Sequence, residues 1–143
     1  VRQYLLQGPA AAAAFLPLVN TAANPEQELA TAQTLWQTPD VVVLGMGDDG
    51  HTASLFPAAD NLAAGLDAAN PQALIGIVPP AAPHRRISMT LAELQRSGKL
   101  YLAIAGASKR AVLDTAAQAV DATYPISYLL QPSEKPLHVY WAA

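Results

Sequence analysis

The feature that most constrains the fold is a run of four apolar residues, Val41 to Leu44, that leads directly into the glycine turn GMGDDGH. A continuous β-branched run is typical of a strand buried on both faces in a parallel sheet. The glycines predict a turn at the end of that strand. We therefore expect a central strand that places residues 45–51 at the carboxyl edge of a parallel sheet.

A helix is expected before this strand. Asn24 can cap free N–H groups, Pro25 fits a first helical turn, and the acidic residues that follow favour the helix dipole. One face of this helix gathers four apolar residues: Leu29, Ala32, Leu35 and Trp36. The segment Thr38-Pro39-Asp40 ends the helix, so the order is helix, turn, strand.

Three further apolar runs predict strands: Leu74 to Val78, Leu100 to Ala105 and Leu137 to Trp141. Because helices alternate with strands, we expect one α/β domain over residues 1–143, a Rossmann-like and mostly parallel sheet flanked by helices. Ligands bind beyond the carboxyl ends of the strands in such sheets. The turns after Leu44, Val78 and Ala105 are therefore the places to search for a site.

Two more helices are expected around these strands. Thr90 and Glu93 have capping-box spacing at the start of a short helix from Leu91 to Ser97, with Gly98 as its left-handed cap. A longer helix follows Gly106 over residues 107–120. Its buried side is expected to carry Val112, Leu113, Ala116 and Val120.

Composition narrows the class of function. With 52% apolar and 13% charged residues, the chain is strongly core-forming. The net charge is −3 and there is no run of Lys or Arg, so the sequence indicates no basic surface for nucleic acid or an anionic membrane. Small-molecule chemistry is therefore favoured. The chain has no cysteine, which excludes disulfide scaffolds and thiolate zinc sites and fits a reducing, cytoplasmic location.

The longest apolar run, Ala10 to Val19, is interrupted by Pro17 and is about half of the roughly 20 residues that a membrane-spanning helix needs. No transmembrane segment is therefore expected. Arg2 is the only cation near the run, so a helix lying on the core is favoured over a secretory signal. Because the chain starts at Val1, we expect the natural N-terminus to lie elsewhere.

Residues 45–50 match the dinucleotide pattern G-x-G-x-x-G directly after a strand. That pattern binds a pyrophosphate on neutral glycine backbone at the N-terminus of a long helix. Here Asp48 and Asp49 would repel the anion, and Pro57 leaves room for little more than a turn or two of helix. The dinucleotide interpretation is therefore not favoured.

The same turn supplies His51 with a carboxylate beside it. A neutral imidazole is a suitable general base, and Asp49 is close enough in sequence to hold its ring. The alternative is a histidine that only caps the following turn; its position at the end of a strand favours catalysis. His84 and His138 are too scattered to propose a metal site, and His138 is interpreted as structural.

Cations follow the other two strand ends: Arg86, beside His84 and Arg85, and Lys109 in the first turn after Gly106. A basic residue at a helix N-terminus opposes the helix dipole, and a phosphate bound there by free N–H groups, Lys109 and Arg86 would account for it. Two solvated surface cations are an equally good interpretation from composition alone. Arg85 could share the phosphate or be solvated.

Four motifs occur in order along the chain: GMGDDGHTASLFP, RRISMTLAEL, GASKRAVL and LHVYWA. In order and spacing they resemble the C-terminal part of the 6-phosphogluconolactonase family. The resemblance implies an α/β fold shared with glucosamine-6-phosphate deaminase and ribose-5-phosphate isomerase relatives. It also implies hydrolysis of 6-phosphoglucono-1,5-lactone to 6-phosphogluconate in the pentose phosphate pathway, with no required metal or cofactor.

The resemblance implies residue roles motif by motif. His51 would be the general base that activates water, and Asp49 would orient it. Arg86 and Lys109 would bind the substrate phosphate. Three glycines would let the backbone approach the sugar, and N–H groups of their turn would act as oxyanion donors: Gly45, Gly47 and Gly50.

This sequence departs from the family in lacking its N-terminal Ser-Gly-Gly phosphate loop and Asp-Glu-Arg motif. We therefore expect a chain truncated at the N-terminus, missing one wall of the site and exposing an apolar edge. Met46 and Asp48 fall at variable positions and are assigned no chemistry. The nearest rival is the deaminase, whose comparable loop carries a glutamate where this chain has Phe56. A non-catalytic sugar-phosphate sensor that uses Arg86 and Lys109 is the rival of another class.

Overall fold

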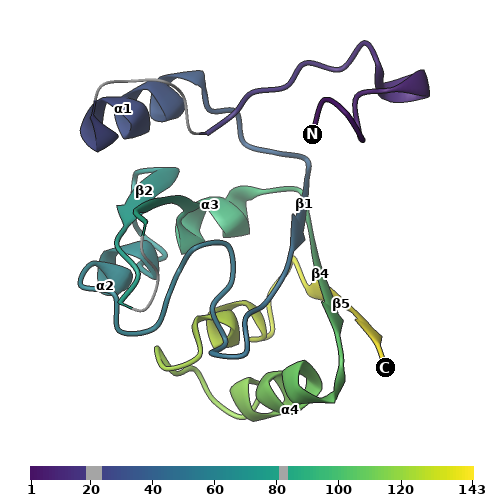
Figure 1. The fold of residues 1–143 in the computed structure, drawn as a ribbon. Helices are drawn as coiled ribbons and strands as arrows, with labels where there is room; N and C mark the ends of the chain where they lie inside the picture. The colour runs from purple at the N-terminus through teal and green to yellow at the C-terminus, as the bar shows by residue number, and fades with distance from the viewer. Residues whose placement is uncertain (19–23, 81–83) are drawn as a thin grey trace.

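The computed structural model describes residues 1–18, 24–80 and 84–143. Its elements are η1 (Gly8–Ala10), α1 (Pro25–Leu35), β1 (Val41–Leu44), α2 (Leu62–Gly65), β2 (Leu74–Ile77), β3 (Arg86–Met89), α3 (Leu91–Arg96), β4 (Lys99–Ala105), α4 (Ala107–Ala116), η2 (Pro125–Leu129) and β5 (Leu137–Ala142). Figure 1 shows α2, α3 and α4 on one side of the sheet that contains β1, β4 and β5.

Strands β1, β4 and β5 form a parallel sheet in the order β1-β4-β5. Val41 pairs with Lys99, and Leu100 pairs with Leu137, so the strands end at the same edge. The predicted parallel sheet flanked by helices is confirmed. Because β1 and β4 are neighbours, the turns after Leu44 and Ala105 lie at one edge of the sheet, as the sequence predicted.

Only one face of this sheet is packed against the core within the described residues. Val42 and Leu44 are buried, whereas Val41 is 54% and Val43 70% exposed. Tyr140 on β5 is 64% exposed. The expectation that β1 is buried on both faces is therefore wrong: its β-branched residues specify a strand, but burial depends on what covers each face.

The predicted strand at Leu74 to Val78 exists as β2, but it does not join the parallel sheet. It pairs in antiparallel register with β3, so that Ile77 lies opposite Arg86. The sequence did not predict β3, because its residues Arg-Ile-Ser-Met form no apolar run. The segment between β2 and β3 includes residues 81–83, which lie outside the described residues.

The helix starts follow the capping chemistry. Asn24 accepts a hydrogen bond from the Gln27 N–H at 2.8 Å, and Thr90 accepts one from the Glu93 N–H at 3.2 Å. The predicted buried faces are less accurate: Ala32 is buried but Leu35 is 54% exposed. The predicted N-caps of α1 and α3 are both confirmed, because each depends on groups only three residues apart.

Two expectations about helix ends are wrong. The backbone of Gly98 is not in the left-handed conformation. What restricts this position is the carbonyl of Asp40, which leaves no space for a Cβ. Helix α4 ends at Ala116, four residues before the predicted end, and Val120 is exposed instead of buried. Leu113 and Ala116 are buried as expected.

The apolar run from Ala10 does not form the expected helix on the core. Ala10 is the last residue of η1. Residues 11–18 form no regular helix, and the side chains of Phe15 and Leu16 are exposed. Val19, the last residue of the predicted segment, lies outside the described residues. Among the described helices, none has the length and apolarity required to span a membrane.

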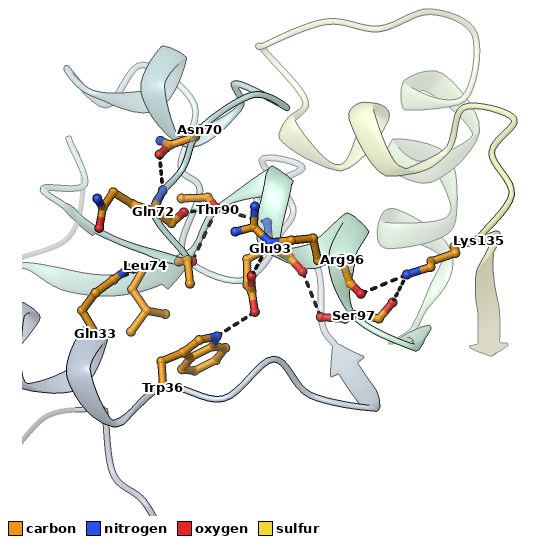
Figure 2. A network of polar contacts seen from close by, with 11 residues as sticks. Gln33, Trp36, Asn70, Gln72, Leu74, Thr90, Glu93, Arg96, Ser97 and Lys135 are labelled. Carbon is orange, nitrogen blue, oxygen red and sulfur yellow. Dashed lines mark hydrogen bonds and ion pairs between the residues drawn. The ribbon is translucent and has the colours of Figure 1, made fainter.

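A buried carboxylate holds α1 against α3. Glu93 is 1% exposed and accepts hydrogen bonds from the Trp36 indole at 2.7 Å and the Arg96 guanidinium at 2.8 Å (Figure 2). Burial raises the pKa of the Glu93 carboxyl, but hydrogen bonds from Trp36, Thr38 and Arg96 outweigh it, and the pKa is lowered. An ionised Glu93 therefore joins the end of α1 to the helix after β3.

Candidate active site

The turn after β1 is closed by its own backbone. The Gly47 N–H donates to the carbonyl of His51 at 3.0 Å, and the Gly50 N–H donates to the carbonyl of Gly47 at 3.0 Å. Thr52, which is 1% exposed, donates its hydroxyl proton to the carbonyl of Gly45 at 2.9 Å. These bonds fix the loop that carries His51 at the carboxyl end of the strand.

His51 and Asp49 form a side-chain pair in this turn. The Nδ1 atom of His51 lies 2.6 Å from Oδ1 of Asp49, and the Asp49 carboxylate also accepts from the His51 backbone N–H at 3.2 Å. Partial burial raises the pKa of Asp49, but these bonds and the charge of the ring outweigh it and lower the pKa. An ionised Asp49 can only accept, so it holds the proton of His51 on Nδ1 and leaves Nε2 as the basic nitrogen.

His51 lines a cavity of about 510 Å³ at the end of the parallel sheet. Lys109, in the first turn of α4, lines the same cavity although it lies 58 residues further along the chain. The other lining residues come from β1, its turn and β4: Val43, Leu44, Gly45, Met46, Gly47, Ala53 and Ala103. The structure thus brings the predicted base and one predicted phosphate ligand to one cavity.

Lys109 is available to an anion. Within the described residues, its ammonium group forms no ion pair with a carboxylate, whereas its neighbour Arg110 pairs with Asp114 at 2.9 Å. Gly106, the residue before α4, has φ +88°, a conformation that favours glycine. Lys109, in the first turn of a ten-residue helix, therefore lines the cavity that contains His51 without a carboxylate partner among the described residues.

The three predicted glycines have different environments. An added Cβ at Gly45 meets no atom within 4 Å, and Gly45 lines the cavity. At Gly47 a Cβ would overlap the His51 ring and lie 2.5 Å from Oδ1 of Asp49. Gly50 has φ +74° and packs against Tyr124. It is not one of the described residues that line the cavity. The N–H groups of Gly47 and Gly50 are used inside the turn, so they are not free for an oxyanion.

Arg86 begins β3 and does not follow a strand of the parallel sheet, contrary to expectation. Among the described residues it does not line the His51 cavity. It shares a face of β3 with Ser88, whose Oγ accepts from the Ser54 N–H of the His51 loop at 3.0 Å. The Arg85 guanidinium instead lies against Gly76, on the opposite face of the hairpin.

Three residues near the site were missed from the sequence. Thr52 and Ser88 are buried hydroxyls that hold the His51 loop, and Phe56 stacks on the His51 ring. Their signals in the sequence are weak, because Ser, Thr and Phe occur commonly in turns and cores. Ser88 and Ser54 are 34 residues apart, so only the folded chain shows that they meet.

Comparison with known proteins identifies the family of this chain. The family model of glucosamine-6-phosphate isomerases and 6-phosphogluconolactonases matches residues 1–141. A 6-phosphogluconolactonase of Neisseria meningitidis serogroup A is 42% identical over 147 residues, which cover 99% of this chain and 64% of the relative. The solved structure of a 6-phosphogluconolactonase from Shewanella baltica has a TM-score of 0.90 and 35% identity, over 99% of this chain and 62% of that one.

The fold is also shared with a deaminase. A monomeric glucosamine-6-phosphate deaminase matches with a TM-score of 0.65 and 18% identity, over 85% of this chain and 54% of that one, which shows the fold alone. The chain spans less than two thirds of the length of each of these three proteins. From the family match and the close relatives, the chain belongs to the glucosamine-6-phosphate isomerase/6-phosphogluconolactonase family.

Proposed function

We propose that the protein carrying this chain hydrolyses 6-phosphoglucono-1,5-lactone to 6-phosphogluconate. The observation that carries the proposal is the His51–Asp49 pair on a cavity that also contains Lys109. Relatives that cover nearly the whole chain are 6-phosphogluconolactonases, which supports this substrate. The arrangement supplies a base and an anion-binding cation, as hydrolysis of a phosphorylated ester requires.

In this mechanism Nε2 of His51 takes a proton from water as the water oxygen attacks the lactone carbonyl carbon. The ring C–O bond then breaks, and the leaving oxygen takes the proton back from the imidazolium. Asp49 stabilises the imidazolium through Nδ1, at 2.6 Å. General-base catalysis by a positioned histidine contributes about 100- to 10 000-fold.

The phosphate is bound away from the reacting carbonyl, so its binding energy orients the lactone. Lys109 and the N-terminus of α4 supply positive charge and free N–H groups for this anion. We assign a second contact to Arg86 and not to Arg85, because Arg86 shares a strand face with Ser88, which contacts the His51 loop. Gly45 and Gly47 line the part of the cavity where the sugar ring would lie.

A deaminase activity is less well supported by the residues present. Phe56, at the position where the family resemblance implies a glutamate in the deaminase, stacks on the His51 ring with centroids 4.1 Å apart. A phenyl ring exchanges no proton, so Phe56 cannot take the role of that glutamate. One histidine base is sufficient for lactone hydrolysis.

The test is the rate of lactone hydrolysis above the spontaneous rate, measured with the wild-type chain and with His51→Asn. We expect kcat to fall by about 100-fold or more in this variant. His138→Asn is the matched control, because His138 lies on the exposed face of β5 against Tyr101. Wild-type kcat in His51→Asn, or release of ammonia from glucosamine 6-phosphate, would overturn the proposal. Binding of 6-phosphogluconate without any turnover would identify a sensor instead.

A further inference from the structure

The ring of His51 has a neighbour that the proposed mechanism does not use. Phe56 stacks on it with the ring centroids 4.1 Å apart and the planes inclined by 27°. Phe56 is half-buried and packs against the hydrophobic core, whereas the His51 side chain is 28% exposed. One face of the imidazole therefore rests on a side chain that the core holds in place.

The local chain path explains this contact. The Leu55 N–H donates to the carbonyl of Thr52 at 2.9 Å, and both residues are 1% exposed. This tight turn folds the chain back after His51, so that the residue after buried Leu55 returns over the imidazole. The position of Phe56 is thus fixed by the same loop that fixes His51.

The imidazole is held by three groups. Asp49 contacts Nδ1 at 2.6 Å, the Gly47 backbone lies so close that a Cβ would overlap the ring, and Phe56 covers one face. Rotation of an imidazole about χ2 is otherwise broad, because this torsion joins an sp³ to an sp² atom. A stacked aromatic face favours the orientation of the imidazole that lies against it, through a contact that an aliphatic side chain does not make.

We propose that Phe56 is a positioning residue for His51: its ring keeps the imidazole oriented with Nδ1 on Asp49 and Nε2 free to act as the base in the cavity. The inference rests on the proposed lactone hydrolysis for its effect on rate. Its structural part concerns the His51 ring alone. Without Phe56 the ring samples orientations in which Nδ1 does not donate to Asp49, and both neutral tautomers become populated.

The test compares Phe56→Leu and Phe56→Tyr with the wild-type chain. Leucine keeps the apolar volume but removes the aromatic face, and tyrosine keeps that face. Phe15→Leu is the matched control, because the chain has two phenylalanines and Phe15 lies in the exposed N-terminal segment beside Arg2. Thermal unfolding of each variant verifies that it is folded.

The first readout needs no substrate. In spectra that correlate imidazole nitrogens with ring protons, we expect wild-type His51 to show one tautomer, protonated on Nδ1, assigned by loss of its signals in His51→Asn. In Phe56→Leu the two nitrogen shifts should move toward each other, as expected when both tautomers are populated. The signals of His84 and His138 serve as internal references, and Phe56→Tyr and Phe15→Leu should match the wild type.

The second readout is steady-state hydrolysis of the lactone. We expect kcat to fall about tenfold in Phe56→Leu, with KM changed less than about twofold, and to recover in Phe56→Tyr. Wild-type His51 nitrogen shifts and kcat in a folded Phe56→Leu variant would overturn the inference and leave Phe56 as core packing. A shift change confined to Phe56→Leu supports the positioning role even if no form hydrolyses the lactone, which separates it from failure of the proposed function.

Discussion

The hydroxyl of Ser108 donates a hydrogen bond to Oδ1 of Asp48 at 3.2 Å. Ser108 is in the first turn of α4, one residue before Lys109, and Asp48 is in the turn that ends at His51. The bond joins two segments that are 60 residues apart in the chain. It therefore links the turn that carries the proposed base to the helix that carries the proposed phosphate ligand, although the sequence assigned Asp48 no chemistry.

Removing this bond should weaken substrate binding. In Asp48→Ala, we expect KM for the lactone to rise about fivefold, because an exposed hydrogen bond of this kind contributes about 1 kcal/mol. Asp48→Asn keeps an oxygen that can accept from Ser108 and should stay near the wild-type KM. Equal KM values in all three proteins would show that α4 is held without this contact.

Gly47→Ala should displace the catalytic ring. An added Cβ would overlap the His51 imidazole, and we expect kcat to fall about 100-fold, as for a base misplaced by about 1 Å. Gly45→Ala is the structural comparison, since its Cβ meets no atom within 4 Å and should leave the His51 ring resonances unchanged. Wild-type ring resonances in Gly47→Ala would contradict the close approach of backbone and ring.

A comparison of variants at Lys109 and at its neighbour Arg110 distinguishes a phosphate-binding role from a general effect of net charge. Lys109 lines the cavity, whereas Arg110 pairs with Asp114 and lies over Trp141. We expect Lys109→Ala to raise KM about tenfold or more through loss of a charge-assisted contact to the phosphate. Arg110→Ala removes the same charge and should leave KM within about twofold. A similar rise in both variants would assign the effect to net charge.

Glu93 should make the stability of the chain depend on pH in the acid range. The pKa of its carboxyl is lowered from 4.5 in the folded chain, so the stabilisation is complete above that value. It is lost as the pH falls through 4.5 toward the lower folded pKa. We expect Glu93→Gln to lower the free energy of unfolding at pH 7 by about 1–3 kcal/mol.

The measurement is denaturant unfolding of wild type and Glu93→Gln at several pH values from neutral to acid. The difference between the two proteins should shrink below pH 4.5. Glu134→Gln, at an exposed carboxylate, is the control and should follow the wild type. A difference that is constant across this range would show that Glu93 acts through packing instead of charge.

Local signals predicted the helix starts and the strands well. The caps at Asn24 and Thr90 depend on contacts three residues away, and the strand at Val41 to Leu44 follows from a run of β-branched residues. The partners of these elements depend on distant parts of the chain. This is why β2 was placed in the wrong sheet and β3 was missed.

The candidate site shows the same difference between local contacts, which the sequence predicts, and contacts between distant parts of the chain, which it predicts only in part. His51 and Asp49 are two residues apart, so their pairing could be read from the sequence, and the rule for parallel strand ends placed Lys109 near them. Arg86 was placed by the same rule, but β2 is antiparallel to β3 and outside that sheet, so the rule does not apply to it. The contact between Phe56 and His51 required the folded path of the turn.

The most direct measurement is a titration of the isotope-labelled chain with 6-phosphogluconate, followed by backbone amide shifts. The account predicts saturable shifts at His51 and Lys109, with smaller ones at Arg86, that are lost in Lys109→Ala. A nicotinamide dinucleotide, as control, should cause none. A folded chain that shows no shift at His51 and Lys109 with the sugar phosphate, or that responds to the dinucleotide at these residues, would contradict the account.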